Sequence, residues 1–196
     1  MVPLVGLTGG IGAGKSEALR ALGELGAATL STDGVVHELL QEPEVRDLVV
    51  ERLGEGVAPG GRVDRSLVAE RVFGDDELRA WLEGVLWPRV GERMLAWKAE
   101  VDATDPPPPA AVVEVPLLFE SGMAGAFDHT LAVVADEGVR ERRAAERGHA
   151  AVASRAGRQL PQQEKAERAE FVVRNDGSLD ELKETLSRVL ATIEAS

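Results

Sequence analysis

The sequence has no cysteine and only three histidines, and it contains no long apolar run. Without cysteine, disulfide bonds and thiolate metal sites are excluded, and His37, His129 and His149 lack the spacing of metal ligands, so we expect no zinc site. A membrane span needs roughly 18 or more consecutive apolar residues, and no stretch reaches that length. The chain also starts without the ordered basic, apolar and cleavage segments of an export signal, so we expect a cytoplasmic protein with no membrane role.

Positive charge is also scarce, because 22 Lys and Arg stand against 34 Asp and Glu, a formal net charge of −12. This balance argues against binding to nucleic acid, which depends on neutralising many phosphates. One region, from Arg140 to Arg158, nevertheless concentrates six arginines. Such a run is ordinarily a solvated helix face. Beside a phosphate-binding loop it would instead bind anions, and the composition leaves both interpretations open.

Short apolar runs alternate along the chain with segments of helical spacing. The runs expected to be strands cover 4–7, 27–30, 110–115, 131–135 and 171–173. The expected helices cover 16–25, 34–41, 44–53, 64–72, 75–101, 160–168 and 179–194, with the arginine-rich region also helical. Pro88 is expected to break or begin a helix. Strands that alternate with helices predict an α/β fold with a mainly parallel sheet covered by helices on both faces.

The segment Gly9–Ser16 contains the pattern G-x-x-x-x-G-K-S, directly after the first expected strand and at the start of the first expected helix. Its glycines let backbone N–H groups turn toward phosphate oxygens, while Lys15 reaches the β and γ phosphates and the Ser16 hydroxyl ligates Mg²⁺. The helix N-terminus adds partial positive charge to the same site. The residues predicted to hold the nucleotide are Gly9, Gly10, Ile11, Gly12, Ala13, Gly14, Lys15 and Ser16.

This motif and its context predict a small ATP-dependent P-loop kinase. We expect a three-layer P-loop fold with a helical lid, built as one domain over residues 1–196. Within that domain we expect a helical acceptor-side region at about 34–101 and the lid at about 138–165.

Three carboxylates are candidates for the chemistry. Asp33 follows the second expected strand, where ligand-contacting residues of parallel sheets gather, and either accepts the proton of an attacking hydroxyl, helps to organise Mg²⁺, or caps a helix. Glu114 interrupts an apolar strand, so it is either a ligand on the Mg²⁺ side or the buried partner of an arginine. Glu120 is either on the substrate side or structural.

Arginines of the 140–158 region are candidates for neutralising the transferred phosphate, because phosphoryl transfer relies on positioning and electrostatic stabilisation. The candidates are Arg143, Arg147 and Arg155, with Arg143 ranked above Arg147. Arg140 and Arg142 are not included.

Several segments, in order, resemble the dephospho-coenzyme A kinase (dephospho-CoA kinase) family over essentially the whole chain. Gly6–Ser16 resembles the family's L-T-G-G-I-G-S-G-K-S, and Asp33 falls at the second aspartate of its D-A-D motif. The other matches are Arg65 with L-D-R, Val115–Glu120 with V-P-L-L-F-E, Arg143 and Arg147 with paired lid arginines, Arg155 and Gln159 with R-x-x-x-Q, Lys165 with E-K, and Asn175–Gly177 with N-x-G.

Some departures from the family pattern concern mainly the acceptor pocket. Ser31 replaces the first aspartate of the D-A-D motif, and His37 replaces an arginine. Trp87 replaces the histidine of an H-P pair, and Glu114 and Glu170 each replace an aspartate.

The resemblance implies transfer of the ATP γ-phosphate to the ribose 3′-hydroxyl of dephospho-CoA, the last step of coenzyme A biosynthesis, with Mg²⁺ as cofactor. It implies that Asp33 draws the hydroxyl proton, that Lys15 and Arg143 stabilise the moving charge, and that Arg147 contacts ATP. The residues implied to bind the acceptor are Thr8, Asp33, Arg65, Leu117, Glu120 and Arg155.

Three other functions stay open from the residues alone. The first is a kinase for another small nucleoside or nucleotide, because the motifs locate the donor site better than the acceptor site. The second is a GTP-dependent switch, although no N-K-x-D guanine-recognition segment is present. The third is a relative that binds nucleotide without turnover.

Overall fold

The structure is a computed structural model that describes residues 1–146 and 159–196. The chain forms two compact units, one made of Met1–Ser31 with Lys98–Ser196 and the other of Thr32–Trp97. The second unit covers most of the helical region expected at about 34–101. The assignment of one domain to the whole chain, the acceptor-side role of that region and the lid boundaries stay predictions.

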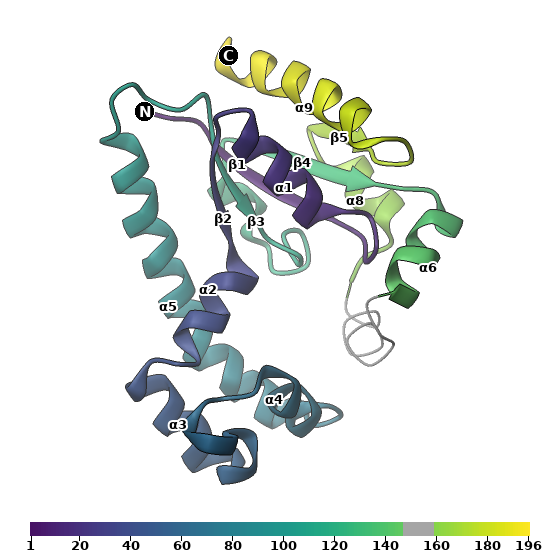
Figure 1. The fold of residues 1–196 in the computed structure, drawn as a ribbon. Coiled ribbons are helices and arrows are strands. Elements are labelled where there is room, and N and C mark those ends of the chain that lie inside the picture. Colours follow the sequence, from purple (N-terminus) through teal and green to yellow (C-terminus); the bar gives the residue numbers. More distant parts are fainter. Residues whose placement is uncertain (147–158) are drawn as a thin grey trace. The chain divides into compact units, whose positions relative to one another are not determined.

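A five-stranded sheet forms the centre of the first unit (Figure 1). Its strands are β1 Leu4–Gly9, β2 Ala28–Ser31, β3 Ala111–Glu114, β4 His129–Val134 and β5 Phe171–Arg174. They lie in the order β2-β3-β1-β4-β5, and every pairing is parallel. The parallel α/β fold predicted from the alternating pattern is therefore confirmed. All carboxyl ends of the strands meet at one edge, which is where ligands of such sheets bind.

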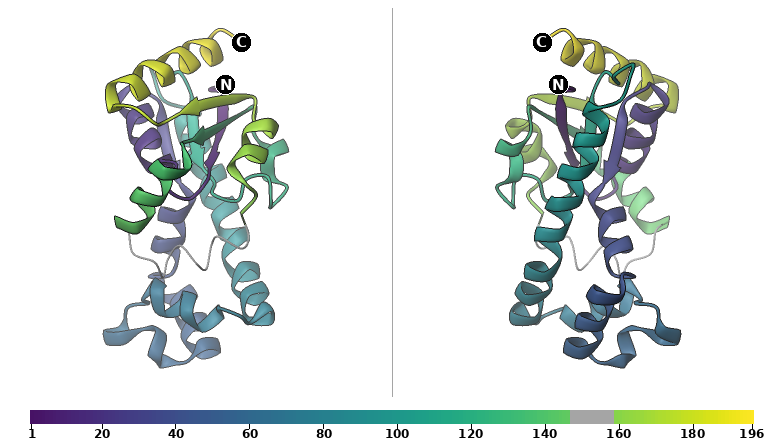
Figure 2. Two further views of the ribbon diagram at one scale, coloured as in Figure 1. Left: turned by 90° about the vertical axis from the view of Figure 1, so that its right-hand side faces the viewer. Right: turned by 90° about the vertical axis from the view of Figure 1, so that its left-hand side faces the viewer.

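Helices cover both faces of this sheet, as predicted (Figure 2). The helices of the first unit are α1 Lys15–Glu24, α6 Glu137–Glu146, α8 Gln162–Arg168 and α9 Leu179–Glu194, with a short 3-10 turn, η3 Met123–Ala126. Helices α1 and α9 pack against each other on one face, whereas α8 packs on β1 and β4 from the other. Since alternate residues of a strand point to opposite faces, Val5 and Leu7 join the core beneath α1 and α9, and Thr8 contacts α8.

The second unit is helical and has buried apolar residues of its own. Its helices are α2 Thr32–Leu39, α3 Pro43–Leu53, α4 Arg65–Val72 and most of α5 Asp76–Asp102, with two 3-10 turns, η1 Glu55–Val57 and η2 Pro59–Gly61. Val35 of α2, Val45 and Val49 of α3, and Val68 of α4 are buried, and α3 and α4 both pack against η1. The side chain of Asp64 caps α4 by accepting hydrogen bonds from the amides of Ser66 and Leu67 at 2.8 and 3.3 Å.

Two details of the helices differ from the expectation. Helix α2 begins at Thr32, so Asp33 lies within its first turn rather than ahead of the helix as its cap. Pro88 neither breaks nor begins a helix, because α5 continues through it. Gly84, four residues earlier, is exposed and has no side chain, so water can reach the carbonyl that the proline leaves without an amide donor. Among the described helices, none combines the length and apolar character needed to cross a bilayer.

Candidate active site

The loop between β1 and α1 has a backbone that requires glycine at two positions. Gly12 and Gly14 have φ of 76° and 92°, in the left-handed region. A Cβ added to Gly12 would lie 2.5 Å from the backbone oxygen of Arg140, and one added to Gly14 would lie 2.0 Å from Nδ2 of Asn175. The spacing of glycines in the motif therefore reflects both backbone conformation and close packing of neighbours.

Side chains hold the carbonyl groups of the loop in fixed directions. Nζ of Lys15 donates to the oxygens of Gly9 and Gly10 at 3.0 and 3.1 Å. Nε of Arg140 donates to the oxygen of Ile11, and Nδ2 of Asn175 to that of Ala13, both at 3.0 Å.

The amide groups of the loop point the other way. In a planar trans peptide the N–H of one residue points opposite to the C=O of the residue before it. These donors therefore also fix the directions of the N–H groups that follow the four held carbonyls, those of Gly10, Ile11, Gly12 and Gly14. Helix α1 begins at Lys15, so its N-terminal partial charge lies at the end of the same loop, with exposed Ser16 as its second residue.

Arginines of α6 lie beside the loop. Nη1 of Arg143 donates to the backbone oxygen of Asn175 at 3.0 Å, and a Cβ on Gly14 would lie 3.6 Å from the same Nη1. The structure thus brings Arg143 to the predicted phosphate site. Arg147 and Arg155 lie outside the described residues.

Sequence reasoning missed Arg140 and Asn175 as site residues. Arg140 precedes Arg143 by three residues and so shares its helix face, a spacing that could have included it. Asn175 comes directly after β5, at the carboxyl edge of the sheet, and is buried. Its match to the N-x-G element was visible, but no local pattern indicates that its amide would reach Ala13.

Glu114 lies buried at the carboxyl end of β3, opposite Ser31 of β2 and Leu7 of β1 in the strand register. Oγ of Ser31 donates a hydrogen bond to Oε2 of Glu114 at 3.0 Å. Neither of the two interpretations made from the sequence, a ligand on the Mg²⁺ side or the partner of an arginine, included this contact. The carboxylate nevertheless lies at the expected edge, one strand from the phosphate loop.

Lys165 of α8 is fully buried and contacts β1 and the segment that follows β3. Its Nζ lies 3.3 Å from Oγ1 of Thr8, 2.6 Å from the backbone oxygen of Pro116 and 2.8 Å from Oε1 of Glu120. Burial of this ammonium lowers the pKa of Lys165 below its ordinary value of 10.5, and the Glu120 carboxylate opposes that shift.

Two of the predicted acceptor residues thus belong to one network. Thr8 and Glu120 are joined by Lys165, and Oε1 of Glu120 also accepts from the amide of Leu160 at 2.8 Å. Oε2 of Glu120 is buried without a hydrogen-bond partner among the described residues. Leu117, half-buried, lies in the turn between Pro116 and Glu120. Direct contact of these residues with a substrate stays a prediction.

The second unit brings Asp33 and Arg65 together. Nη2 of Arg65 lies 2.8 Å from Oδ1 of Asp33, and its Nη1 donates to the Asp33 backbone oxygen at 3.3 Å. Both side chains are about one third exposed, at 35% and 37%. The contact fixes the Asp33 carboxylate on the first turn of α2 while leaving it open to solvent.

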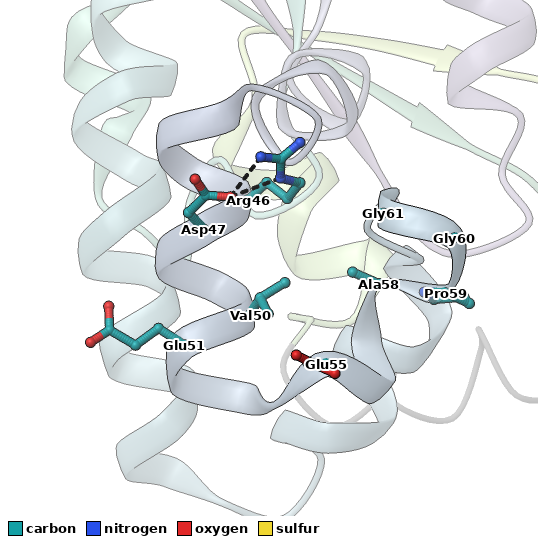
Figure 3. A pocket seen from close by; sticks show the side chains of 9 residues that line it. All are labelled: Arg46, Asp47, Val50, Glu51, Glu55, Ala58, Pro59, Gly60 and Gly61. Carbon is teal, nitrogen blue, oxygen red and sulfur yellow. Dashed lines mark hydrogen bonds and ion pairs between the residues drawn. The ribbon is translucent and has the colours of Figure 1, made fainter.

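A separate pocket of the second unit lies between α3 and the two 3-10 turns (Figure 3). The guanidinium of Arg46 is paired with Asp47 at 2.7 Å, and the other charged lining residues are acidic. This charge is unsuited to a phosphate group. The lining residues are Arg46, Asp47, Val50, Glu51, Glu55, Ala58, Pro59, Gly60 and Gly61, none of which was predicted as a site residue.

A parallel α/β sheet whose first strand leads through such a loop into a helix, with a lysine and arginines beside the loop, defines a P-loop kinase. The dephospho-CoA kinase family model matches residues 3–181. A dephospho-CoA kinase of Protochlamydia amoebophila is 40% identical over 187 residues, covering 93% of this chain and 92% of the relative. The enzyme of the same name from Deinococcus radiodurans is 38% identical over 193 residues, covering 97% and 92%.

A crystal structure of a Thermus thermophilus protein superimposes with a TM-score of 0.81 at 34% identity, over 97% of each chain. The chain therefore belongs to the dephospho-CoA kinase family, whose members phosphorylate the 3′-hydroxyl of dephospho-CoA in the final step of coenzyme A biosynthesis. The resemblance stated from the sequence motifs is confirmed.

Proposed function

We propose that this chain transfers the γ-phosphate of ATP to the ribose 3′-hydroxyl of dephospho-CoA, and that it does so with the residues described above. The observation that carries the proposal is the arrangement of the phosphate loop, in which four carbonyls are held by Lys15, Arg140 and Asn175. The contacts of Arg140 and Asn175 do not involve Lys15, so the amides that follow Ile11 and Ala13 are already oriented when a triphosphate binds, which is the property that electrostatic catalysis requires.

On the donor side, Lys15 and Arg143 stabilise the charge of the moving phosphoryl group. Both are cations beside the loop, and phosphoryl transfer leaves the protein little covalent chemistry beyond positioning and charge stabilisation. In the described structure Lys15 contacts loop carbonyls, so nucleotide binding exchanges carbonyl oxygens for phosphate oxygens around its ammonium. Arg147 keeps its proposed role in contacting ATP.

The donor atoms present suit Mg²⁺. Hard oxygen ligands are what this ion prefers, and it is usually held by one or two protein groups together with phosphates and water rather than by a protein cage. The Ser16 hydroxyl would hold the ion, and the Glu114 carboxylate lies at the same edge of the first unit. Among the described residues no cluster of three or more His, Asp or Glu forms a cage. When bound, Mg²⁺ would neutralise part of the negative charge of the phosphates.

On the acceptor side, Asp33 accepts the proton of the ribose hydroxyl. Its carboxylate is held by Arg65 and is accessible to solvent, so a substrate hydroxyl can reach it. A positioned general base must lie within hydrogen-bond reach of the proton it takes, and the Arg65 contact restricts the carboxylate to one orientation. Thr8, Arg65, Leu117, Glu120 and Arg155 are the proposed acceptor contacts.

The test is direct: purified protein is incubated with ATP, Mg²⁺ and dephospho-CoA, and coenzyme A is quantified by chromatography and mass spectrometry. We expect one coenzyme A for each ADP formed. ADP release with other nucleosides but not with dephospho-CoA would redirect the assignment to another acceptor. Lack of measurable ATP affinity would refute the donor site as well. We also propose that the protein works in the cytoplasm, which localisation of a tagged copy would test.

A further inference from the structure

Lys165 joins β1 to the turn that follows β3, two segments that are distant in sequence and adjacent at the catalytic edge of the first unit. Its ammonium has three N–H donors, and the structure provides three oxygen acceptors, on Thr8, Pro116 and Glu120. Thr8 is the residue directly before Gly9, where the phosphate loop begins. Pro116 and Glu120 bracket the turn that follows β3. One side chain therefore ties the donor loop to the proposed acceptor turn.

The stability of the fold does not explain a charge at this position. Lys165 is 0% exposed and its partner Glu120 is 12% exposed. Taking both ions out of water is costly, and replacing a buried ion pair by apolar residues of similar volume is often neutral or stabilising. An apolar pair would fill the same space but could not hold the Thr8 hydroxyl and the Pro116 carbonyl in place. Lys165 therefore contributes by positioning the Thr8 hydroxyl and the Pro116 carbonyl.

Helix α8 also lies close to the phosphate loop. Gln162, one turn before Lys165 on the same face, bonds to both backbone groups of Ala135 at the end of β4, at 3.2 Å to the nitrogen and 2.7 Å to the oxygen. A Cβ on Gly10 would lie 3.2 Å from Cβ of Gln162. The helix thus fixes the ends of β1 and β4 and borders the loop. A displacement of α8 caused by a substitution at Lys165 would therefore move the phosphate loop.

We infer that Lys165 is a positioning residue for phosphoryl transfer: acting through Thr8 and Pro116, it sets the phosphate loop relative to the acceptor turn. This inference rests on the proposed function and assigns a role that the donor-site motif does not contain. Small displacements of reacting groups are costly in such a site, where a shift of about 1 Å can lower the rate by about a hundredfold.

The experiment separates position from stability with a paired substitution. Lys165→Met alone leaves the Glu120 carboxylate buried without its cation, so we expect a lower Tm. Lys165→Met with Glu120→Leu removes both charges, and we expect its Tm to return to near that of the parent. Its kcat should nevertheless fall by about tenfold to a hundredfold. The fall should exceed that of Glu120→Gln, which removes the Glu120 carboxylate but keeps Lys165 and its contacts with Thr8 and Pro116. Arg168→Met, on the same helix with a surface partner, is the matched control and should leave kcat and Tm unchanged.

Thr8→Val tests whether the effect passes through the proposed contact. It removes the hydroxyl with little change in shape, and we expect kcat to fall several-fold in the parent. The fall should be smaller in the paired variant, where the contact with Lys165 is already absent and only the 3.4 Å bond of Thr8 to the Pro116 oxygen is left to lose. A merely structural lysine would not produce this dependence. Equal losses in both backgrounds, or a paired variant with parent-like kcat, would overturn the inference.

The result remains decisive if the proposed function fails. A parent that forms no coenzyme A refutes the proposed function and not the role of Lys165. The same set of variants is then compared by calorimetric titration with ATP. We expect weaker ATP binding in Thr8→Val and in the paired variant, and a combined loss smaller than the sum of the two separate losses. Parent-like ATP affinity in the paired variant would refute the positioning role on its own.

Discussion

Substitutions at Gly14 and at Asn175 should break the same hydrogen bond, which predicts that their effects on stability are not additive. Replacing Gly14 by Ala places a Cβ 2.0 Å from Nδ2 of Asn175, a buried amide that donates to the oxygen of Ala13. The amide must move, so Gly14→Ala breaks the same hydrogen bond that Asn175→Ala deletes. The two substitutions therefore share one cost.

The magnitudes follow from the geometry. Asn175→Ala leaves the Ala13 carbonyl without its donor, which costs about 1–3 kcal/mol for a buried group. Gly14→Ala carries that cost plus about 1–2 kcal/mol for a side chain at φ 92°. In the double variant the conformational cost remains, whereas the hydrogen bond is lost only once. We expect the double variant to be about as stable as Gly14→Ala alone, with a coupling energy of about 1–3 kcal/mol.

The assay is urea unfolding of the parent, the two single variants and the double variant, with ATP affinity measured on each. We expect the affinities to show the same coupling, since the Ala13 carbonyl orients the amide of Gly14 toward the phosphates. Gln163→Ala, an exposed position on α8, is the control and should change neither quantity. Additive losses of stability, within about 0.5 kcal/mol, would refute the shared hydrogen bond.

Three further predictions test separate parts of the structure. Asp33→Asn should lower kcat by about 10²–10⁴ without changing ATP affinity, and a kcat within about twofold of the parent would exclude a general base. The folded-state pKa of Lys165 lies below 10.5, so just under that pH the unfolded chain holds a proton that the folded chain releases, and stability rises with pH. Lys165→Met should remove this rise in urea midpoints measured as the pH approaches 10.5 from below; parallel curves would contradict it. Ser178→Ala breaks the capping box of α9 and should cost about 0.5–2 kcal/mol at unchanged kcat.

Much of the fold could be predicted because its signals are local. The run Ala111–Val113 is buried on both faces and reads as a continuous apolar segment, as expected for a strand inside a parallel sheet. Helix α9 occupies 179–194 as predicted, since Ser178 and Glu181 form a capping box ahead of its apolar stripe. Pro88 was ambiguous because a proline within a helix depends on how the freed carbonyl is solvated, which the sequence does not specify.

The phosphate loop was predictable for the same reason, whereas its supports were not. Glycines, lysine and serine at fixed spacing are a local pattern, but the donors that orient the loop lie far along the chain. Arg140 is 129 residues from Ile11, and Asn175 is 162 residues from Ala13. These contacts exist because parallel strands bring their carboxyl ends to one edge, so the register of β4 and β5 decides which side chains reach the loop. The register of the strands is established only when the sheet folds, so these contacts could not be predicted from the sequence.

Two departures from the family pattern, Ser31 and Glu114, form a single interaction in the folded chain. They are direct partners in the register of β2 and β3, and the Ser31 hydroxyl donates to the Glu114 carboxylate at 3.0 Å. Two aspartates at these positions would place two like charges side by side in a site where burial is costly. A short hydroxyl opposite a longer carboxylate keeps a polar contact across the strands and removes one of the two charges. Together the two residues keep one anion at the carboxyl edge of the sheet, with the Ser31 hydroxyl as its hydrogen-bond donor.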